Sequence, residues 1–129
     1  MASGLPAATG DVLTAATVNG LVTFTVNADQ TADYTAVLTD QYQCVVPMNK
    51  ATAVAFKIPT NASVAFPVGT AITILNKGAG AVTISAVTSG TTTVLSAGAV
   101  AAAPTLAQYK MAVAVKTATD TWYVSGSIG

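Results

Sequence analysis

Short runs of alternating apolar and polar residues, separated by Gly, Pro, Asn and Asp, fill the chain from residue 21 onward. The alternation is clearest in VTFTV (22–26) and AITI (71–74), where Thr points to one side and large apolar groups to the other. A period of two residues is typical of β-strands, and no helical period persists over three turns. The pattern predicts an all-β protein with strands at about residues 21–26, 34–39, 43–47, 52–58, 71–76, 81–86, 91–95, 108–116 and 121–126.

The segment ITILNKGAGAVTI (72–84) holds two strand patterns joined by a Gly-rich turn. We expect a β-hairpin here, because Gly78 and Gly80 can adopt the positive φ that a tight return between strands requires. A phosphate-binding loop is the alternative. It fits poorly, because no helix pattern follows and Lys77 precedes the glycines instead of following them.

Residues 1–20 differ from the rest, with Gly, Pro and Ala at their start and few large apolar groups. We interpret them as an extended N-terminal arm that orders against a neighbouring surface, with a loose terminus as the alternative. Residues 21–129 then form one domain. Its strand pattern predicts an antiparallel β-sandwich, either jelly-roll-like or immunoglobulin-like.

Charge is scarce in this chain of 129 residues: five Lys and five Asp cancel, charged residues make up 8%, and Arg, Glu and His are absent. Soluble domains carry roughly 25% charged residues, so the surface is poorly covered for a free monomer. Without Arg or net positive charge, nucleic-acid binding is not expected. No apolar run reaches the length of a membrane span, and residues 1–6 lack the basic start of a secretory signal.

Catalytic chemistry finds little support in the sequence. Without His there is no Ser-His or Cys-His pair, and Asp29, Asp33 and Asp40 stand where Asp is a common turn residue, so we expect no enzyme and no cofactor. One Cys and no His cannot fill a zinc site, and Cys44 fits a small buried hydrophobe. The run NADQTAD (27–33) offers oxygen ligands but lacks the Gly and Glu of a calcium loop, so no metal is expected.

The aromatic residues divide into two groups. In a chain this poor in bulky side chains, one group serves as anchors of the core: Phe24, Phe56, Phe66, Trp122 and Tyr123. The other group suits an interface, because a tyrosine ring can be buried while its hydroxyl keeps a partner: Tyr34, Tyr42 and Tyr109.

Five stretches together resemble a β-rich module of tailed-bacteriophage virion proteins: YTAVLTD (34–40), VAFKIP (54–59), FPVGT (66–70), NKGAGAVTI (76–84) and TDTWYVSG (119–126). The module occurs in tail-fibre proteins and in small capsid-associated proteins. GDVLTAATVN (10–19) also resembles the lead-in to such domains in phage fibres. The resemblance implies a structural, non-enzymatic protein of the virion, usually a homotrimer, and supplies no catalytic residues.

Between the two classes, the size favours a capsid decoration (cement) protein, because a tail fibre also brings a shaft and an anchoring domain. The expected partners are copies of itself and the major capsid protein, at local three-fold sites. The alternative is a tail-fibre domain that binds a host receptor or glycan through exposed aromatic rings such as Tyr42, Tyr109 or Trp122. The expected subunit or capsid contacts are Leu5, Val12, Leu13, Val18, Tyr34, Tyr42 and Tyr109.

Overall fold

The computed structural model describes residues 24–42 and 44–129, which form two β-sheets and one short 3₁₀ helix. The bounds are β1 Thr25–Val26, β2 Tyr34–Thr35, η1 Leu38–Gln41, β3 Cys44–Met48, β4 Val54–Ile58, β5 Ala71–Asn76, β6 Val82–Ala86, β7 Thr93–Ser96, β8 Thr105–Leu106, β9 Met111–Ala118 and β10 Thr121–Gly126. The six-stranded sheet has the order β1-β3-β5-β9-β10-β7, and the four-stranded sheet has the order β2-β4-β6-β8. The all-β prediction is confirmed.

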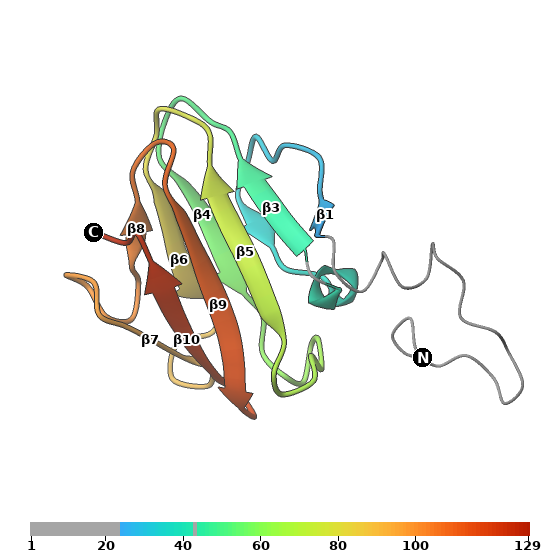
Figure 1. The fold of residues 1–129 in the computed structure, drawn as a ribbon. Helices are drawn as coiled ribbons and strands as arrows, with labels where there is room; N and C mark the ends of the chain where they lie inside the picture. Colours follow the sequence, from blue (N-terminus) through green and yellow to red (C-terminus); the bar gives the residue numbers. More distant parts are fainter. Residues whose placement is uncertain (1–23, 43) are drawn as a thin grey trace, which may run out of the picture.

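Successive strands alternate between the two sheets from β1 to β9. Figure 1 shows the result as two layers, with β5 and β9 in front of β4 and β6. From β1 to β6 the chain crosses to the other layer after each strand and then returns, so that strands two apart in the sequence lie side by side and run parallel. The neighbours β1, β3 and β5 are therefore parallel, as are β2, β4 and β6. The strands β8, β9 and β10 add the antiparallel pairs.

Two successive turns of this winding stack on each other. The register that pairs Val45 with Thr73 in one sheet continues with the same offset to Ile58 and Ala86 in the other. Between them, the backbone N–H of Gly80 donates to the carbonyl of Lys50 at 2.9 Å. A Cβ added at Gly80 would lie 1.9 Å from the carbonyl oxygen of Thr52, so this turn needs glycine because another backbone lies against it.

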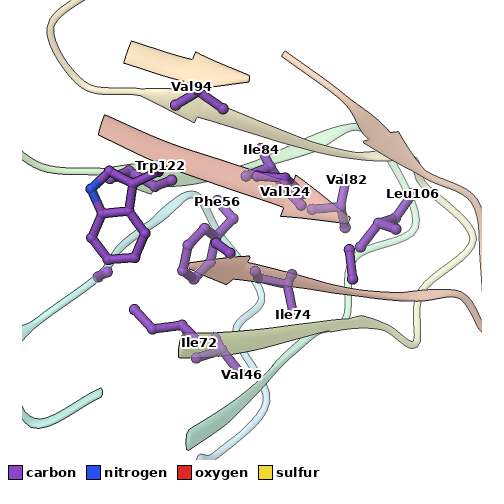
Figure 2. Close-up of a cluster of buried hydrophobic side chains, with 14 of the residues drawn as sticks. Val46, Phe56, Ile72, Ile74, Val82, Ile84, Val94, Leu106, Trp122 and Val124 are labelled. Atoms are coloured by element: carbon purple, nitrogen blue, oxygen red, sulfur yellow. The ribbon is translucent and has the colours of Figure 1, made fainter. Parts of the chain in front are cut away.

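The core lies between the sheets and draws on both. In Figure 2 the side chains of Val46, Ile72 and Trp122 from one layer meet those of Phe56 and Ile84 from the other. Trp122 and Phe66 contact edge to face with ring centroids 5.5 Å apart. Trp122 and Phe56 are the largest of the fully buried side chains, and the rest of the core is mainly aliphatic.

Three sequence predictions about local structure are wrong. The sandwich is mixed, because parallel neighbours occur in both sheets, which neither purely antiparallel architecture provides. Residues 72–84 form no hairpin, because β5 and β6 belong to different sheets. The strand expected at 34–39 ends at Thr35 and gives way to η1, because the Asp40 carboxylate accepts the Val37 backbone N–H at 2.9 Å and closes a helical turn.

Two of the expected core anchors are also misplaced: Phe24 is 59% exposed and Tyr123 is 50% exposed. Trp122, Phe56 and Phe66 are buried as predicted. The expected arm at residues 1–20, and with it the domain boundary at residue 21, lies outside the described residues.

Candidate contact surface on the six-stranded sheet

The side of the six-stranded sheet that faces away from the core is apolar, and we call it the outer face. Because alternate residues of a strand point to opposite sides, the core positions of β3, β5, β9 and β10 place their neighbours on this face. One row pairs Pro47 with Leu75 and Leu75 with Met111, and a second pairs Val115 with Tyr123. No Lys or Asp occupies an outward position on these four strands. The face is therefore uncharged on these strands, and its polar groups are hydroxyl residues: Thr73, Thr117, Thr121 and Ser125.

Several side chains of the outer face are open to solvent. Val26 is 66% exposed, Met111 is 45% exposed and Tyr123 is 50% exposed, although all three are apolar or aromatic. Large apolar groups on a protein surface are unremarkable singly, but a contiguous set of them marks a site of contact.

The corresponding side of the four-stranded sheet has a different composition. Its rows pair Lys57 with Ser85, and Thr83 with both Ala55 and Thr105. This side carries the charge of Lys57 among its hydroxyl groups, whereas the outer face combines hydroxyl residues with valine, leucine, methionine and tyrosine and has no charge on β3, β5, β9 and β10. The two sides of the molecule are thus unequal, and the outer face is the one suited to burial.

A pocket of about 440 Å³ opens at one end of the outer face. It is lined by Val26, Asp29, Pro47, Asn49, Leu75, Lys77 and Tyr109. Apolar side chains from β1, β3 and β5 form its floor, and polar groups stand at its edge. A concave apolar site with a few polar groups is the general form of a binding site for small molecules and peptides.

The polar edge of the pocket is a fixed cluster around Asp29. The Lys77 Nζ lies 3.0 Å from both carboxylate oxygens of Asp29, and Asn49 Nδ2 donates to Asp29 Oδ2 at 3.0 Å. The hydrogen bond from Asn49, followed by that from Lys77, lowers the pKa of Asp29. The carboxylate is thereby kept ionised and oriented, with its negative charge balanced by a neighbouring cation.

Tyr109 stands beside this cluster in a strained backbone conformation. Its φ is +68°, in the left-handed region that a bulky residue adopts rarely, and its side chain is 77% exposed. Its backbone N–H donates to the Asn76 carbonyl at 2.6 Å, which holds the turn in place. The structure thus accepts backbone strain at a residue whose ring it leaves in solvent, a combination typical of contact sites.

A second polar cluster surrounds Asp40, which is 1% exposed at the end of η1. Its carboxylate accepts from the Tyr34 hydroxyl at 2.7 Å and from Asn27 Nδ2 at 2.9 Å. Burial, and next the hydrogen bond to Asp40, raises the pKa of Tyr34. Burial, and next the charge of Asp40, raises the pKa of Cys44. This cluster holds β1, β2 and η1 together, and its thiol stays protonated and unreactive.

The contact residues expected from sequence fall in three places. Leu5, Val12, Leu13 and Val18 lie outside the described residues. Tyr34 is half-buried against Phe56, with 5.8 Å between ring centroids. Tyr42 is 56% exposed after η1, and Tyr109 is on the pocket. Sequence reasoning missed Leu75 and Met111, because Thr73 and Thr117 share their sides of β5 and β9 and give those sides a mixed pattern.

Within residues 24–42 and 44–129, no group of three His, Cys, Asp or Glu side chains is placed to hold a metal ion. The carboxylates of the run 27–33 instead point to separate partners, Asp29 to Lys77 and Asp33 to the backbone N–H of Ala55. No helix in the described part of the chain is long and apolar enough to cross a membrane.

Comparison with known proteins adds no relative: no family model, no curated protein and no solved structure matches this chain.

Proposed function

We propose that this protein is a structural subunit of a bacteriophage particle, a decoration protein that binds the assembled capsid as a homotrimer at local three-fold sites. The observation that carries the proposal is the outer face, which is uncharged on the strands β3, β5, β9 and β10 and exposes Met111 and Tyr123. The resemblance of the five sequence stretches to virion modules is the reason for proposing a bacteriophage particle. An apolar face and a sparsely charged chain both favour a protein that neighbours cover.

The trimer would bury the outer face between sister subunits, and the arm, residues 1–20, would clamp an adjacent subunit. A specific interface of standard size buries about 1,600 Å² in total, most of its energy coming from a few central apolar or aromatic residues. Met111 and Leu75 are paired neighbours on adjacent strands, and Tyr123 lies on the next strand along. We assign these three residues to the contact.

The mechanism needs no chemical step. A protein that binds the assembled shell but not its loose subunits stabilises the shell by mass action, and many such contacts raise the barrier to separation of neighbouring capsomers. Under this proposal the arm residues Leu5, Val12, Leu13 and Val18 contact an adjacent subunit.

The test uses capsids stripped of this protein and then incubated with the purified chain or its variants. Shell occupancy and the melting temperature of the capsid are measured. Wild-type protein is expected to bind and to raise the melting temperature. Met111→Lys, which places a charge on the outer face, is expected to bind far less, whereas Thr83→Lys on the four-stranded sheet is the matched control that keeps binding. Equal binding by both variants would contradict the role of the outer face, and unchanged occupancy after deletion of residues 2–19 would contradict that of the arm.

A tail-fibre domain that binds a host glycan is the second candidate, and one observation favours it. The pocket combines an exposed, conformationally fixed Tyr109 ring with the Asp29 carboxylate and the Asn49 amide. Sugars bind by stacking on aromatic rings and by hydrogen bonding to such polar groups. Trp122 cannot contribute, because it is 1% exposed. Binding of the chain to host cells that is lost in Tyr109→Ala and kept in Tyr42→Ala would support this candidate; no binding by wild type would remove it.

A further inference from the structure

Lys116 is a lysine buried at the end of β9, only 2% exposed. Its Nζ donates to the side-chain oxygen Oδ1 of Asn61 at 2.5 Å and to the backbone carbonyl of Phe66 at 2.7 Å. Among the described residues the ion pairs are Lys57 with Asp33 and Lys77 with Asp29, so Lys116 takes part in neither. Its amine is therefore held against a carboxamide group instead of a carboxylate.

A carboxylate nevertheless contacts the backbone of the same asparagine. Asp120, at the turn between β9 and β10, accepts the backbone N–H of Asn61 at 2.7 Å and the Thr92 hydroxyl at 3.2 Å. Asp120 has φ +56°, so the turn holds it in the left-handed region where a side chain is rarely placed. Three distant segments of the chain thus bring an amine, a carboxamide and a carboxylate together.

Buried aromatic side chains cover one side of this partly buried site. Phe66, whose carbonyl receives the second Lys116 hydrogen bond, packs edge to face on Trp122. Trp122 is the register partner of Lys116 on the neighbouring strand and is itself buried. An amine and a carboxamide held in contact beside buried aromatic rings have a large entropic advantage over the same groups in solution.

We propose that Lys116 and Asn61 form an intramolecular isopeptide bond, with Asp120 as the group that carries the proton. This inference goes beyond the proposed function and does not depend on it, because the bond closes within one chain. A covalent tie here would join the loop after β4 to β9 across the end of the sandwich.

The reaction conserves atoms and electrons without any oxidant or co-reactant. In the first step a movement of the β9–β10 turn brings the Asp120 carboxylate to the Lys116 ammonium, which gives it one proton. The free electron pair on Nζ then attacks Cγ of Asn61. The Nζ–Cγ bond forms, the Cγ–Nδ2 bond breaks, and Nδ2 takes up the proton carried by Asp120 together with the second proton released by Nζ. One ammonium ion leaves, and the product is a secondary amide.

The test is the intact mass of the full-length chain, measured by mass spectrometry after denaturation. A chain that has formed the bond is lighter than its sequence mass by one ammonia molecule. After digestion with trypsin, the peptide that holds Asn61 is expected to be joined to the one that holds Lys116, with no cleavage after Lys116. A full sequence mass together with normal cleavage after Lys116 would overturn the proposal, without bearing on association with a particle.

Two variants separate this bond from other losses of ammonia. Cyclisation of Asn61 onto its own backbone also removes ammonia, but it does not need the lysine and would persist in Lys116→Met. If the isopeptide bond causes the loss of mass, Lys116→Met is expected to restore the full mass. Asp120→Asn keeps the shape of the side chain and is expected to leave most molecules at the full mass. A light mass that persists in Lys116→Met would overturn the bond, and one that persists in Asp120→Asn would overturn the role of Asp120.

Discussion

Substitution of Gly80 by alanine tests whether the chain winds in stacked turns. Gly80 lies outside the left-handed region, so its backbone suits alanine, and without a clash the change would stabilise the protein by about 0.4–1 kcal/mol through the unfolded chain. The structure predicts the opposite sign. The added Cβ would lie 1.9 Å from the Thr52 carbonyl oxygen and 2.1 Å from its carbonyl carbon, and both atoms belong to backbone.

To relieve that clash, the two turns must move apart until the new Cβ and the Thr52 carbonyl reach a normal van der Waals distance. Overpacking of this kind costs roughly 1–3 kcal/mol. Separation also weakens the bond from the Gly80 N–H to the Lys50 carbonyl at 2.9 Å and that from Asn76 Nδ2 to the Gly80 carbonyl at 2.8 Å. Each hydrogen bond contributes about 1 kcal/mol. We therefore expect Gly80→Ala to lower the free energy of unfolding by about 3 kcal/mol.

The assay is urea unfolding followed by the fluorescence of Trp122, which is buried in the core. Ala79→Ser is the matched control, because Ala79 is exposed between the two glycines and a surface change alters stability by no more than about 0.5 kcal/mol. If Gly80→Ala is as stable as wild type or more stable, the two turns are not stacked, and the parallel winding is refuted.

Three further predictions concern the polar groups that hold the fold. Asn76→Ala leaves the Gly78 N–H and the carbonyls of Gly80 and Leu106 without their side-chain partner, and urea unfolding should show a loss of about 2–4 kcal/mol; wild-type stability would contradict the buried network. Because the pKa of Tyr34 is raised, its stabilising effect is present below the ordinary tyrosine value of about 10 and is lost as the pH rises toward the folded value. The Tyr34→Phe variant should therefore lose less stability than wild type between pH 9 and pH 12, and it should lack the part of the tyrosine absorbance change that occurs at the highest pH. A variant with the same pH dependence as wild type would contradict the raised pKa of Tyr34. Cys44, whose pKa burial raises, should resist a thiol reagent until the protein unfolds, and fast labelling in the native state would contradict its burial.

The positions of most strands could be predicted from the sequence, because alternation reports directly on which side chains face a core. The ranges 71–76 and 121–126 match β5 and β10 residue for residue. The two-residue strand β8 was missed, since Thr105–Leu106 is too short to show a period. Phe24 and Tyr123 were misplaced because aromatic character alone does not distinguish the two faces of a strand.

Strand pairing could not be predicted, because a period of two residues identifies faces but not neighbours. The run 72–84 looked like a hairpin since two strands flank a glycine turn, yet the glycines serve the close approach of another backbone. The common offset that pairs Val45 with Thr73 and Ile58 with Ala86 becomes visible only once the fold supplies the register.

The candidate contact surface was within reach of the sequence only in part. Tyr109 was named as an interface residue, and the scarcity of charge indicated a covered surface. The pocket itself joins Asp29, Asn49 and Lys77 across three turns of the winding, so no local spacing brings them together. The contacts of Lys116 could not be predicted for the same reason, because its partners Asn61 and Phe66 lie in a loop that is distant in the sequence.

The most direct test of the central claim, that copies of this chain cover its outer face, is the molar mass in solution by size-exclusion chromatography with light scattering. At micromolar concentration the wild-type chain is expected to elute with three times the chain mass, and Met111→Lys with the mass of one chain. Thr83→Lys, on the polar side, is expected to remain trimeric. A wild-type chain that stays monomeric would contradict the claim.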